Sequence, residues 1–542
     1  MKKDAVKYLL IALGAALLFI PFLGQAHLFD WDEVNFAECA REMLLTKNYL
    51  RVQVDFQPFW EKPPLFIWMQ ALCMSVFGIN EFAARLPNAL MGIVTLCTLF
   101  YIGKRVVSER MAWWWVLLYA ASWLPHFYFK SAIIDPTFNF FIFLSFFQVY
   151  LMRYGRKPLL HTVLAGVFLG LAVLTKGPVA ILVALLSLVV YLLLNKGFWG
   201  YKWAHFLLLI VVCAATTFLW FGVDIVRNGW WFTREFITYQ VRLFQTEDAG
   251  HGGPFYYHFI ILLIGCFPAA AFLFQAGRKS AAVRNTKEES EFARWMWILF
   301  WVTLILFSIV KTKIVHYSSL CYFPLSFLAA LQLSRIDEAK VKMKKIVTVL
   351  LSVTGVLLAI VITLLPLVGL NKDKLIPLFD DDFAVANLQA QVPWSYAECA
   401  FGLLYLAGVI VALVWMRRSF RRGMLVLVAV QVLIIQVTVA HFTPKIEAFS
   451  QRAAIEYYKS FAGKDVYLRP LGFASYAFLF YSEKQPSQNP EYYKGKNEWL
   501  LNGKVDKPVY FITKITDTEW SKDPRLVQIG SKNGFVFYKR KE

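Results

Sequence analysis

The chain has 542 residues, of which 58% are hydrophobic and 17% charged, and its formal net charge is +20. A soluble domain carries charge on about a quarter of its residues, so this composition excludes an ordinary soluble protein and predicts one that crosses a membrane many times. The Lys and Arg residues stand in short clusters between apolar runs, which membrane orientation explains more simply than nucleic-acid binding does. The 7 cysteines stand singly, without the spacing of a disulfide framework or a metal cluster.

Thirteen segments approach the roughly 20 apolar residues that a membrane-spanning helix needs. The first follows Met1 and two lysines and lacks the small-residue cleavage site of a signal peptide, so we expect a retained helix. The predicted spans are residues 8–24, 86–103, 111–129, 136–152, 160–175, 178–194, 204–221, 258–275, 293–310, 316–333, 346–366, 397–415 and 423–441.

Two kinds of connection alternate between these spans. One kind is basic, as in "KR" at 104–105 and "RRSFRR" at 417–422, and the positive-inside rule places it in the cytoplasm. The other kind is mixed in charge and rich in aromatic residues, so we expect it on the external side, together with the C-terminus. These external connections are residues 25–85, 130–135, 222–257, 311–315 and 367–396.

The first external loop is too long for a simple connection. Its segments "VNFAECAREMLL" and "LFIWMQALCMSVFG" are amphipathic or apolar but bounded by charges and prolines, which predicts helices lying in the membrane interface. Asp32 and Glu33 open the first of them. As solvated acids they would stabilise the helix dipole; alternatively, an acid at the membrane surface acts as general base on an acceptor hydroxyl. Asp30, Glu38 and Glu42 are expected to be solvated or capping acids.

Three further charged positions stand at predicted external ends. Lys62, before two prolines, either snorkels at the interface or neutralises a phosphate leaving group. Glu61 would then hold Lys62 or a divalent metal in place. Asp135, before a proline at the start of the fourth span, is either a helix cap or a functional carboxylate. Lys176, between the fifth and sixth spans, is either a topological charge or a second phosphate ligand.

Two more external segments place cations beside aromatic rings. Residues 227–258 contain Arg242, and His251 begins a His-Gly-Gly-Pro run that is typical of a mobile gate. Belts of Trp and Tyr at the membrane–water interface explain many of these aromatic residues. A site that recognises a sugar would also need aromatic rings. "KTKIVHYSSLCYFP" carries Lys313 and Tyr317, which are either interface anchors or phosphate contacts. Acidic and basic groups converging on one face suit an anionic lipid donor and a hydroxyl or amine acceptor.

The last hundred residues differ in composition from the rest. "SQRAAIEYYKSFAG" predicts a helix, and four β-prone runs follow: "DVYLRP", "PVYFITKI", "RLVQIG" and "GFVFYKRK". Asn533-Gly534 between the last two runs signals a hairpin turn. We therefore expect a membrane domain at 1–441 and a small external α/β domain at 442–542.

Taken in order, the motifs resemble the membrane glycosyltransferases of the C-type fold. These are the Asp-Glu pair followed by "AREML", then "EKPPL", "ARLPN", "DPTF", "LTKGP" and a Lys-x-x-x-Tyr before the tenth span. The resemblance covers about residues 1–330 and is strongest to lipid A aminoarabinose transferases and protein O-mannosyltransferases. It implies an enzyme that transfers a sugar, with inversion, from a polyprenyl phosphate to a lipid A-like, glycan or protein acceptor. The enzyme would lie among the lipids of a bacterial inner membrane and act at the periplasmic face.

The resemblance also implies roles for single residues. Residues 25–85 would be the catalytic loop and 222–257 a substrate loop. Two departures leave the sugar open: Asn35-Phe36 stand where the aminoarabinose transferases usually have Arg-Tyr, and Phe59 where a tyrosine is often found. The implied roles are the acid-base position at Asp32 with Glu33 as helper, the second carboxylate at Asp135, and phosphate contacts at Lys62, Tyr317 and Arg242, with Glu61 beside Lys62.

The rival interpretation is a transporter or flippase of a lipid-linked anion. Such a protein places charges near the bilayer midplane, in broken helices. Here the charges gather at one face, and a large external domain has no evident transport role. The sequence therefore favours the enzyme.

Overall fold

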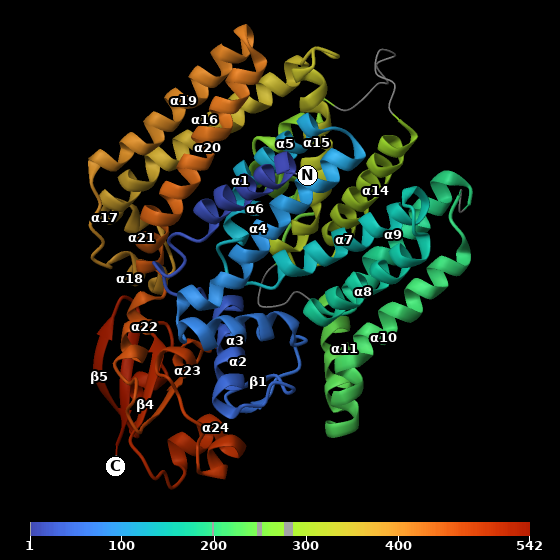
Figure 1. Cartoon of the computed structure of the whole chain (residues 1–542). Helices are drawn as coiled ribbons and strands as arrows, with labels where there is room; N and C mark the ends of the chain where they lie inside the picture. The colour runs from blue at the N-terminus through green and yellow to red at the C-terminus, as the bar shows by residue number, and fades with distance from the viewer. Residues whose placement is uncertain (1, 198–199, 246–251, 276–285, 542) are drawn as a thin grey trace.

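The computed structural model describes residues 2–197, 200–245, 252–275 and 286–541 (Figure 1). Within this part, eight helical segments are long and apolar enough to cross a membrane. They confirm a polytopic helical membrane protein. The segments are Glu81–Val106 (α4), Pro158–Lys176 (α8), Trp203–Asn228 (α10), Lys287–Ile309 (α14), Val315–Asp337 (η1 and α15), Lys345–Leu370 (α16), Tyr396–Arg418 (η3 and α19) and Phe420–Ala448 (α20, η4 and α21).

The remaining predicted spans are helical but shorter or less apolar, so the count of thirteen stays a prediction. The last of these predicted spans, residues 258–275, forms two helices instead of one. Phe267 and Pro268 lie between the end of α12 and the start of α13. These helices are α1 (Lys2–Phe19), α5 (Glu109–Ala121) with α6 (Trp123–Tyr128), α7 (Asp135–Tyr154), α9 (Val179–Asn195), and α12 (Tyr257–Gly265) with α13 (Ala269–Leu273).

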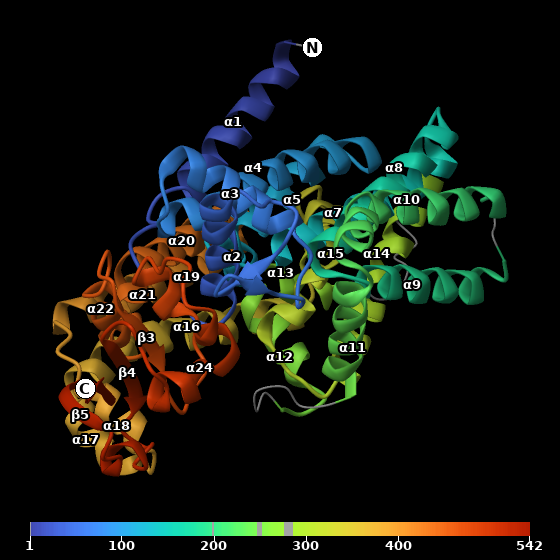
Figure 2. The same ribbon diagram turned by 90° about the horizontal axis from the view of Figure 1, so that it is seen from below.

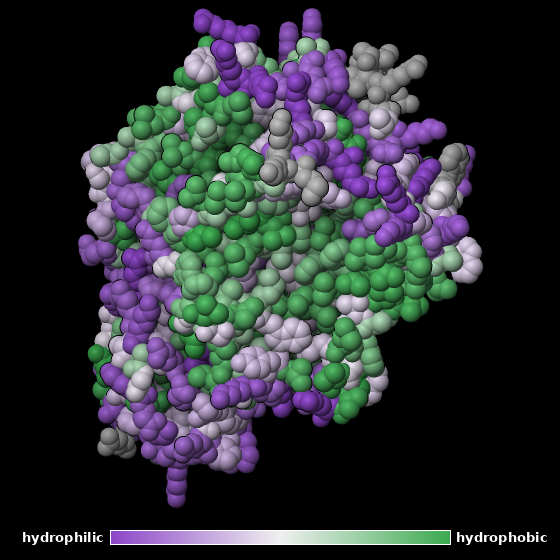
Figure 3. Space-filling view, in the orientation of Figure 1, coloured by the Kyte–Doolittle hydropathy of each residue, from purple (hydrophilic) through white to green (hydrophobic). Residues whose placement is uncertain are grey.

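Small residues and aromatic rings hold the helical body together. A Cβ on Gly166 of α8 would lie 2.7 Å from the Leu209 carbonyl oxygen of α10, so only glycine lets these two helices approach so closely. In the core, the Phe143 ring of α7 stacks on Phe323 of α15, with 4.5 Å between ring centroids. Hydrophobic residues gather over the middle of the molecule and hydrophilic ones over its upper end and its C-terminal part (Figure 3). This banding fits a membrane around the middle.

The first external loop contains the two helices that the sequence predicts. They are α2 (Asp32–Thr46) and α3 (Leu65–Phe77), separated by the two short strands β1 (Gln53–Val54) and β2 (Gln57–Pro58). From below, these helices lie between the C-terminal elements and α11 (Trp231–Gln245) (Figure 2).

Helix α2 is buried almost throughout, which corrects the expectation for its acids. Glu38 is buried and accepts two hydrogen bonds from Arg41, at 2.6 and 2.7 Å. Glu42 is buried too, and one of its oxygens accepts from the Phe56 amide at 2.8 Å. Burial, with Glu38 beside it, holds the pKa of the Glu42 carboxyl well above its usual range. Neither residue is a solvated surface acid.

The C-terminal residues form a four-stranded sheet with helices beside it. The strand order is β3-β4-β6-β5, with β3 and β4 parallel and the other pairs antiparallel. The expected hairpin joins β5 to β6, and Asn533 and Gly534 supply its positive φ angles of 46° and 83°. The elements are α22 (Arg452–Lys459), β3 (Tyr467–Pro470), α23 (Ala477–Tyr481), α24 (Pro490–Asn502), β4 (Val509–Lys514), β5 (Leu526–Lys532) and β6 (Phe535–Arg540). The domain boundary at residue 442 stays a prediction.

Charged and polar contacts join these C-terminal elements to the first external loop. Asp55, in the turn between β1 and β2, pairs with Arg469 of β3 at 3.1 Å and also with Lys484. The Tyr492 hydroxyl of α24 donates to the same carboxylate at 3.0 Å. The loop that carries Asp32 is therefore held from one side by the C-terminal elements.

Candidate functional site

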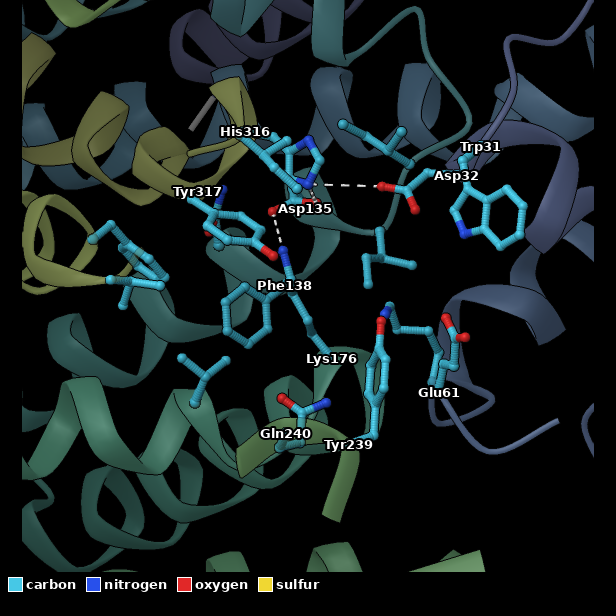
Figure 4. A pocket seen from close by; sticks show the side chains of 18 of the residues that line it. Trp31, Asp32, Glu61, Asp135, Phe138, Lys176, Tyr239, Gln240, His316 and Tyr317 are labelled. Atoms are coloured by element: carbon cyan, nitrogen blue, oxygen red, sulfur yellow. Dashed lines mark hydrogen bonds and ion pairs between the residues drawn. The ribbon is translucent and has the colours of Figure 1, made fainter. Parts of the chain in front are cut away.

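A cavity of about 670 Å³ lies between the first external loop, α7, α8, α11 and η1 (Figure 4). It brings together residues that are more than 280 positions apart in the chain. The predicted site residues that line it are Asp32, Glu33, Glu61, Lys62, Asp135, Lys176, Arg242 and Tyr317.

A buried ion pair forms the inner wall of this cavity. Asp135 opens α7, and the proline that follows it suits the first turn of a helix. Its Oδ1 accepts from the Lys176 ammonium, at the last residue of α8, at 2.6 Å. The Asp135 side chain is only 3% exposed, so Lys176 supplies the charge that its burial requires. The ammonium also lies 5.3 Å from the Tyr317 ring centroid and still has donors for an anion in the cavity.

An imidazole lies between two carboxylates in the cavity. His316 Nε2 is 3.6 Å from Asp32 Oδ2 and 4.0 Å from Asp135 Oδ2. Asp32, the first residue of α2, keeps 30% of its side chain exposed. Figure 4 shows the ring directed toward both acids. Sequence reasoning gave His316 no role, although the Lys-x-x-x-Tyr pattern encloses it.

Lys62 and Arg242 share one aromatic ring. The Lys62 ammonium lies 5.1 Å from the centroid of Tyr239 in α11, and the Arg242 guanidinium lies 5.2 Å from the same centroid. Tyr239 thus holds two of the cations that line the cavity close to one ring. Glu61 lines the cavity beside Lys62.

Glu33 has a structural role that the sequence did not indicate. It accepts two hydrogen bonds from Arg85 of α4, at 2.7 and 3.0 Å, and one each from the Ala132 and Phe29 amides. Arg85 also donates to the carbonyl oxygens of residues 23, 26 and 27. Both side chains are buried, so this pair fixes the loop on the membrane helices. With its oxygens engaged in this way, Glu33 is poorly placed to assist Asp32 as a base.

Removing Arg85 should destabilise the protein strongly. An unpaired buried carboxylate costs about 3–5 kcal/mol, so we expect Arg85→Met to lower the melting temperature in detergent well below that of Arg421→Met, whose arginine is exposed. The double variant Glu33→Gln/Arg85→Met removes both charges and should recover part of the loss. Equal melting temperatures for the single and double variants would contradict the charge argument.

Two predicted residues are not part of the described cavity. Lys313 is buried outside it, and its ammonium donates to the carbonyl oxygens of Ser308 at 2.7 Å, Phe307 at 3.2 Å and Val310. These are the last carbonyls of α14 and the residue after it, so Lys313 caps this helix rather than facing a phosphate. His251 lies outside the described residues.

The described residues show no dedicated metal centre. No group of three or more His, Cys, Asp or Glu side chains is placed in this part of the chain to hold a metal ion. Asp32 has the His316 imidazole near it, and Asp135 is paired with the Lys176 ammonium. A divalent metal at Glu61 therefore stays a prediction.

The helical body, the loop and the cavity define a polytopic membrane protein with the fold of the C-type glycosyltransferases. The chain superposes with a TM-score of 0.76 on the crystal structure of ArnT from Cupriavidus metallidurans bound to undecaprenyl phosphate, at 19% identity, over 99% of this chain and 98% of that one. Residues 61–221 match the family model described as dolichyl-phosphate-mannose-protein mannosyltransferase. That match includes Lys62, Asp135 and Lys176 but not Asp32.

Two relatives carry the same descriptive name. They are undecaprenyl phosphate-alpha-4-amino-4-deoxy-L-arabinose arabinosyl transferases of Wigglesworthia glossinidia brevipalpis and Shewanella sediminis (strain HAW-EB3). The first is 27% identical over 67% of this chain and the second 26% identical over 72%. The matches span 65% and 70% of these relatives' own lengths. The resemblance predicted from the motifs is thus confirmed.

Proposed function

We propose that this chain is an inverting glycosyltransferase that moves a sugar from a polyprenyl phosphate to an acceptor at the periplasmic face of a bacterial inner membrane. The observation that carries the proposal is the cavity that holds the Asp32 carboxylate together with the Lys62 and Lys176 ammonium groups. A protein of the same fold was solved with undecaprenyl phosphate bound, and the two relatives are named for a sugar on that carrier.

The cations have a defined task in this reaction. A sugar linked to a polyprenyl phosphate is a phosphodiester with one negative charge, and its phosphate gains a second charge as the sugar leaves. Fixed cations stabilise such a developing charge more than they stabilise the starting state. Lys62 and Lys176 supply two of them, and Arg242 and Tyr317 can contact the same phosphate. Asp135 positions Lys176 for this task.

Asp32 is the best placed base. It lies in the cavity, is partly exposed, and is near an imidazole rather than an ammonium. An acceptor that gives its proton to Asp32 attacks the anomeric carbon as the phosphate departs from the opposite side, which inverts that carbon. The acceptor is lipid A, another glycan or a protein. Asn35 and Phe59 are both buried and outside the set of cavity-lining residues, so neither departure forms the wall that would meet the sugar.

Transfer and flipping can be separated in proteoliposomes. We expect the purified protein to move radiolabel from an undecaprenyl phosphate-linked sugar, either 4-amino-4-deoxyarabinose or mannose, to envelope extract. Flipping of the same labelled lipid should stay at the level of protein-free liposomes. Flipping without transfer from either donor would favour a transporter and overturn the proposal.

A further inference from the structure

We propose that a smaller cavity beside the first external loop binds the headgroup of phosphatidylethanolamine, which joins a primary ammonium to a phosphate. This smaller cavity has a volume of about 200 Å³ and lies between that loop, the end of α10 and the start of α11. It shares no lining residue with the cavity that contains Asp32. The inference is therefore independent of the proposed function.

The smaller cavity lies where α10 passes from apolar to polar surface. Phe218, Leu219 and Val226 of this helix are exposed and suit contact with lipid chains, whereas the helix ends at the polar Asn228. Trp231, also exposed, follows at the start of α11, and tryptophan gathers at the depth of lipid headgroups. Asn228 and Trp231 both line the smaller cavity, so a headgroup can enter it from the interface.

A buried carboxylate lines the smaller cavity. Asp224 is 6% exposed, and its Oδ1 accepts from the side-chain amide of Asn228 at 2.8 Å. Its Oδ2 is buried and has no hydrogen bond within the part of the chain that the structure describes. A carboxylate oxygen that is withdrawn from water without a donor costs free energy. Asp224 therefore needs a donor from outside this part of the chain, and a positively charged one would satisfy it best.

Aromatic rings beside Asp224 favour an ammonium as that donor. Trp220 and Phe232 line the smaller cavity and meet edge to face, with 4.9 Å between ring centroids. The Trp220 indole N–H already donates to the Leu50 carbonyl oxygen at 3.0 Å, so it does not serve the carboxylate. Aromatic faces attract cations. A primary ammonium also brings the N–H donors that Oδ2 lacks, whereas a quaternary ammonium has none.

Arg51 supplies the opposite charge. It comes from the first external loop, lines the smaller cavity, and lies close enough to act on the charge of Asp224. Its guanidinium nevertheless forms neither a hydrogen bond nor an ion pair with Asp224 or with another described residue. A guanidinium is well suited to bind phosphate oxygens. The smaller cavity thus has one side chain for an ammonium and one for a phosphate.

Phosphatidylethanolamine meets both requirements with one small headgroup. A short ethylene link separates its ammonium from its phosphate, and the two charges cancel, as do those of Asp224 and Arg51. Phosphatidylglycerol has the phosphate but brings no cation to Asp224. Phosphatidylcholine has both charges, but its ammonium has no N–H for the buried oxygen. Bound in this way, the ethanolamine headgroup would link the first external loop to α10.

Lipid binding by the purified full-length protein tests the inference. The protein is freed of co-purified lipid in detergent and titrated with phosphatidylethanolamine, phosphatidylglycerol or phosphatidylcholine of identical acyl chains, and native mass spectrometry measures the bound fraction. We expect phosphatidylethanolamine to bind about 10-fold more tightly than either other lipid, because each of those lacks one charge-assisted contact. Equal affinities for the three lipids, as expected of a cavity that holds only water, would overturn the inference.

Soluble phosphoethanolamine distinguishes the lipid from its free headgroup. It offers the same ammonium and phosphate but has no acyl chains to hold it at the membrane interface. We therefore expect it to displace phosphatidylethanolamine only weakly. Displacement as strong as that by the lipid itself would assign the smaller cavity to the free ester and overturn the lipid as its ligand.

Substitutions on two separate elements assign the binding to this cavity. Asp224→Asn retains the size of the side chain but loses its charge, so the preference for phosphatidylethanolamine over phosphatidylglycerol should fall about 10-fold. Arg51→Gln should weaken the binding of both lipids, because both carry the phosphate. Arg227→Gln, on an exposed arginine at the same helix end but outside the smaller cavity, is the matched control and should bind like the unmodified protein.

Arg51→Gln keeps the test decisive if the buried substitution prevents folding. Arg51 makes no described hydrogen bond or ion pair that the change would remove, so this variant should retain its melting temperature in lipid-free detergent. Affinity of the folded Arg51→Gln protein for phosphatidylethanolamine equal to that of the Arg227→Gln control would overturn the inference.

Discussion

Asp32→Asn should reduce sugar transfer about 1,000-fold, the middle of the range for lost general-base catalysis. The substituted amide retains the size of the side chain and its position at the start of α2, but it cannot accept the acceptor proton. The loss should be expressed in kcat, because the donor phosphate is expected to contact the Lys62 and Lys176 ammonium groups rather than the Asp32 carboxylate. Transfer of radiolabelled sugar by the purified protein measures it.

Two controls separate this effect from damage to the fold. Asp373→Asn changes an exposed aspartate that is outside the cavity, so its transfer rate should match the unmodified protein. The Asp32→Asn protein should retain its affinity for undecaprenyl phosphate and its melting temperature in detergent, since the described contacts of Asp32 include no buried ion pair. If the transfer rate of the Asp32→Asn protein is within about threefold of the rate of the Asp373→Asn control, Asp32 is not the base.

Features that depend on local pattern could be predicted from the sequence. Apolar runs of sufficient length gave the helical segments, and alternating β-prone runs with Asn533-Gly534 gave the C-terminal hairpin. The sidedness of the loops also predicted that Asp32, Lys62 and Asp135 face the same side of the membrane, because sidedness constrains which loops can meet. In the structure all three line one cavity.

Features that depend on a distant partner could not be predicted. Nothing near Glu33 indicates that Arg85, 52 positions away, will bind both of its oxygens, so the sequence assigned a helper carboxylate where the fold has a structural ion pair. Lys313 has the charge of a phosphate ligand but turns back onto carbonyls of α14. The two cases have the same cause. The sequence shows that a charged residue needs a partner, but only the fold determines which group is that partner.

The burial of α2 had the same origin. Its alternation of acids and apolar residues is typical of an interface helix, yet C-terminal elements more than 400 positions away cover it. Arg41 pairs with Glu38 and also donates to the Lys484 carbonyl oxygen at 2.8 Å. A pattern that exposes acids on an isolated helix becomes a buried network once another part of the chain packs over it.

Lys62→Ala should weaken the binding of undecaprenyl phosphate about 10- to 100-fold, which corresponds to the roughly 1.5–3 kcal/mol of a hydrogen bond to a charged group. The reason is that alanine removes an ammonium that Tyr239 holds beside the cavity, whereas Lys176 and Arg242 remain. Quenching of tryptophan fluorescence by the lipid in detergent micelles measures the change. Lys374→Ala, on an exposed lysine outside the cavity, is the matched control and should bind normally.

The same substitution should affect transfer more than binding. The phosphate has one negative charge in the donor and approaches two as the sugar leaves, so each fixed cation is worth more in the transition state than in the ground state. We therefore expect kcat/KM of Lys62→Ala to fall further than its affinity for the lipid. Lys62→Arg should recover binding better than it recovers kcat, because the planar guanidinium of arginine places the positive charge differently from the lysine ammonium. Equal losses in binding and in kcat/KM would mean that Lys62 holds the carrier without stabilising the departing phosphate.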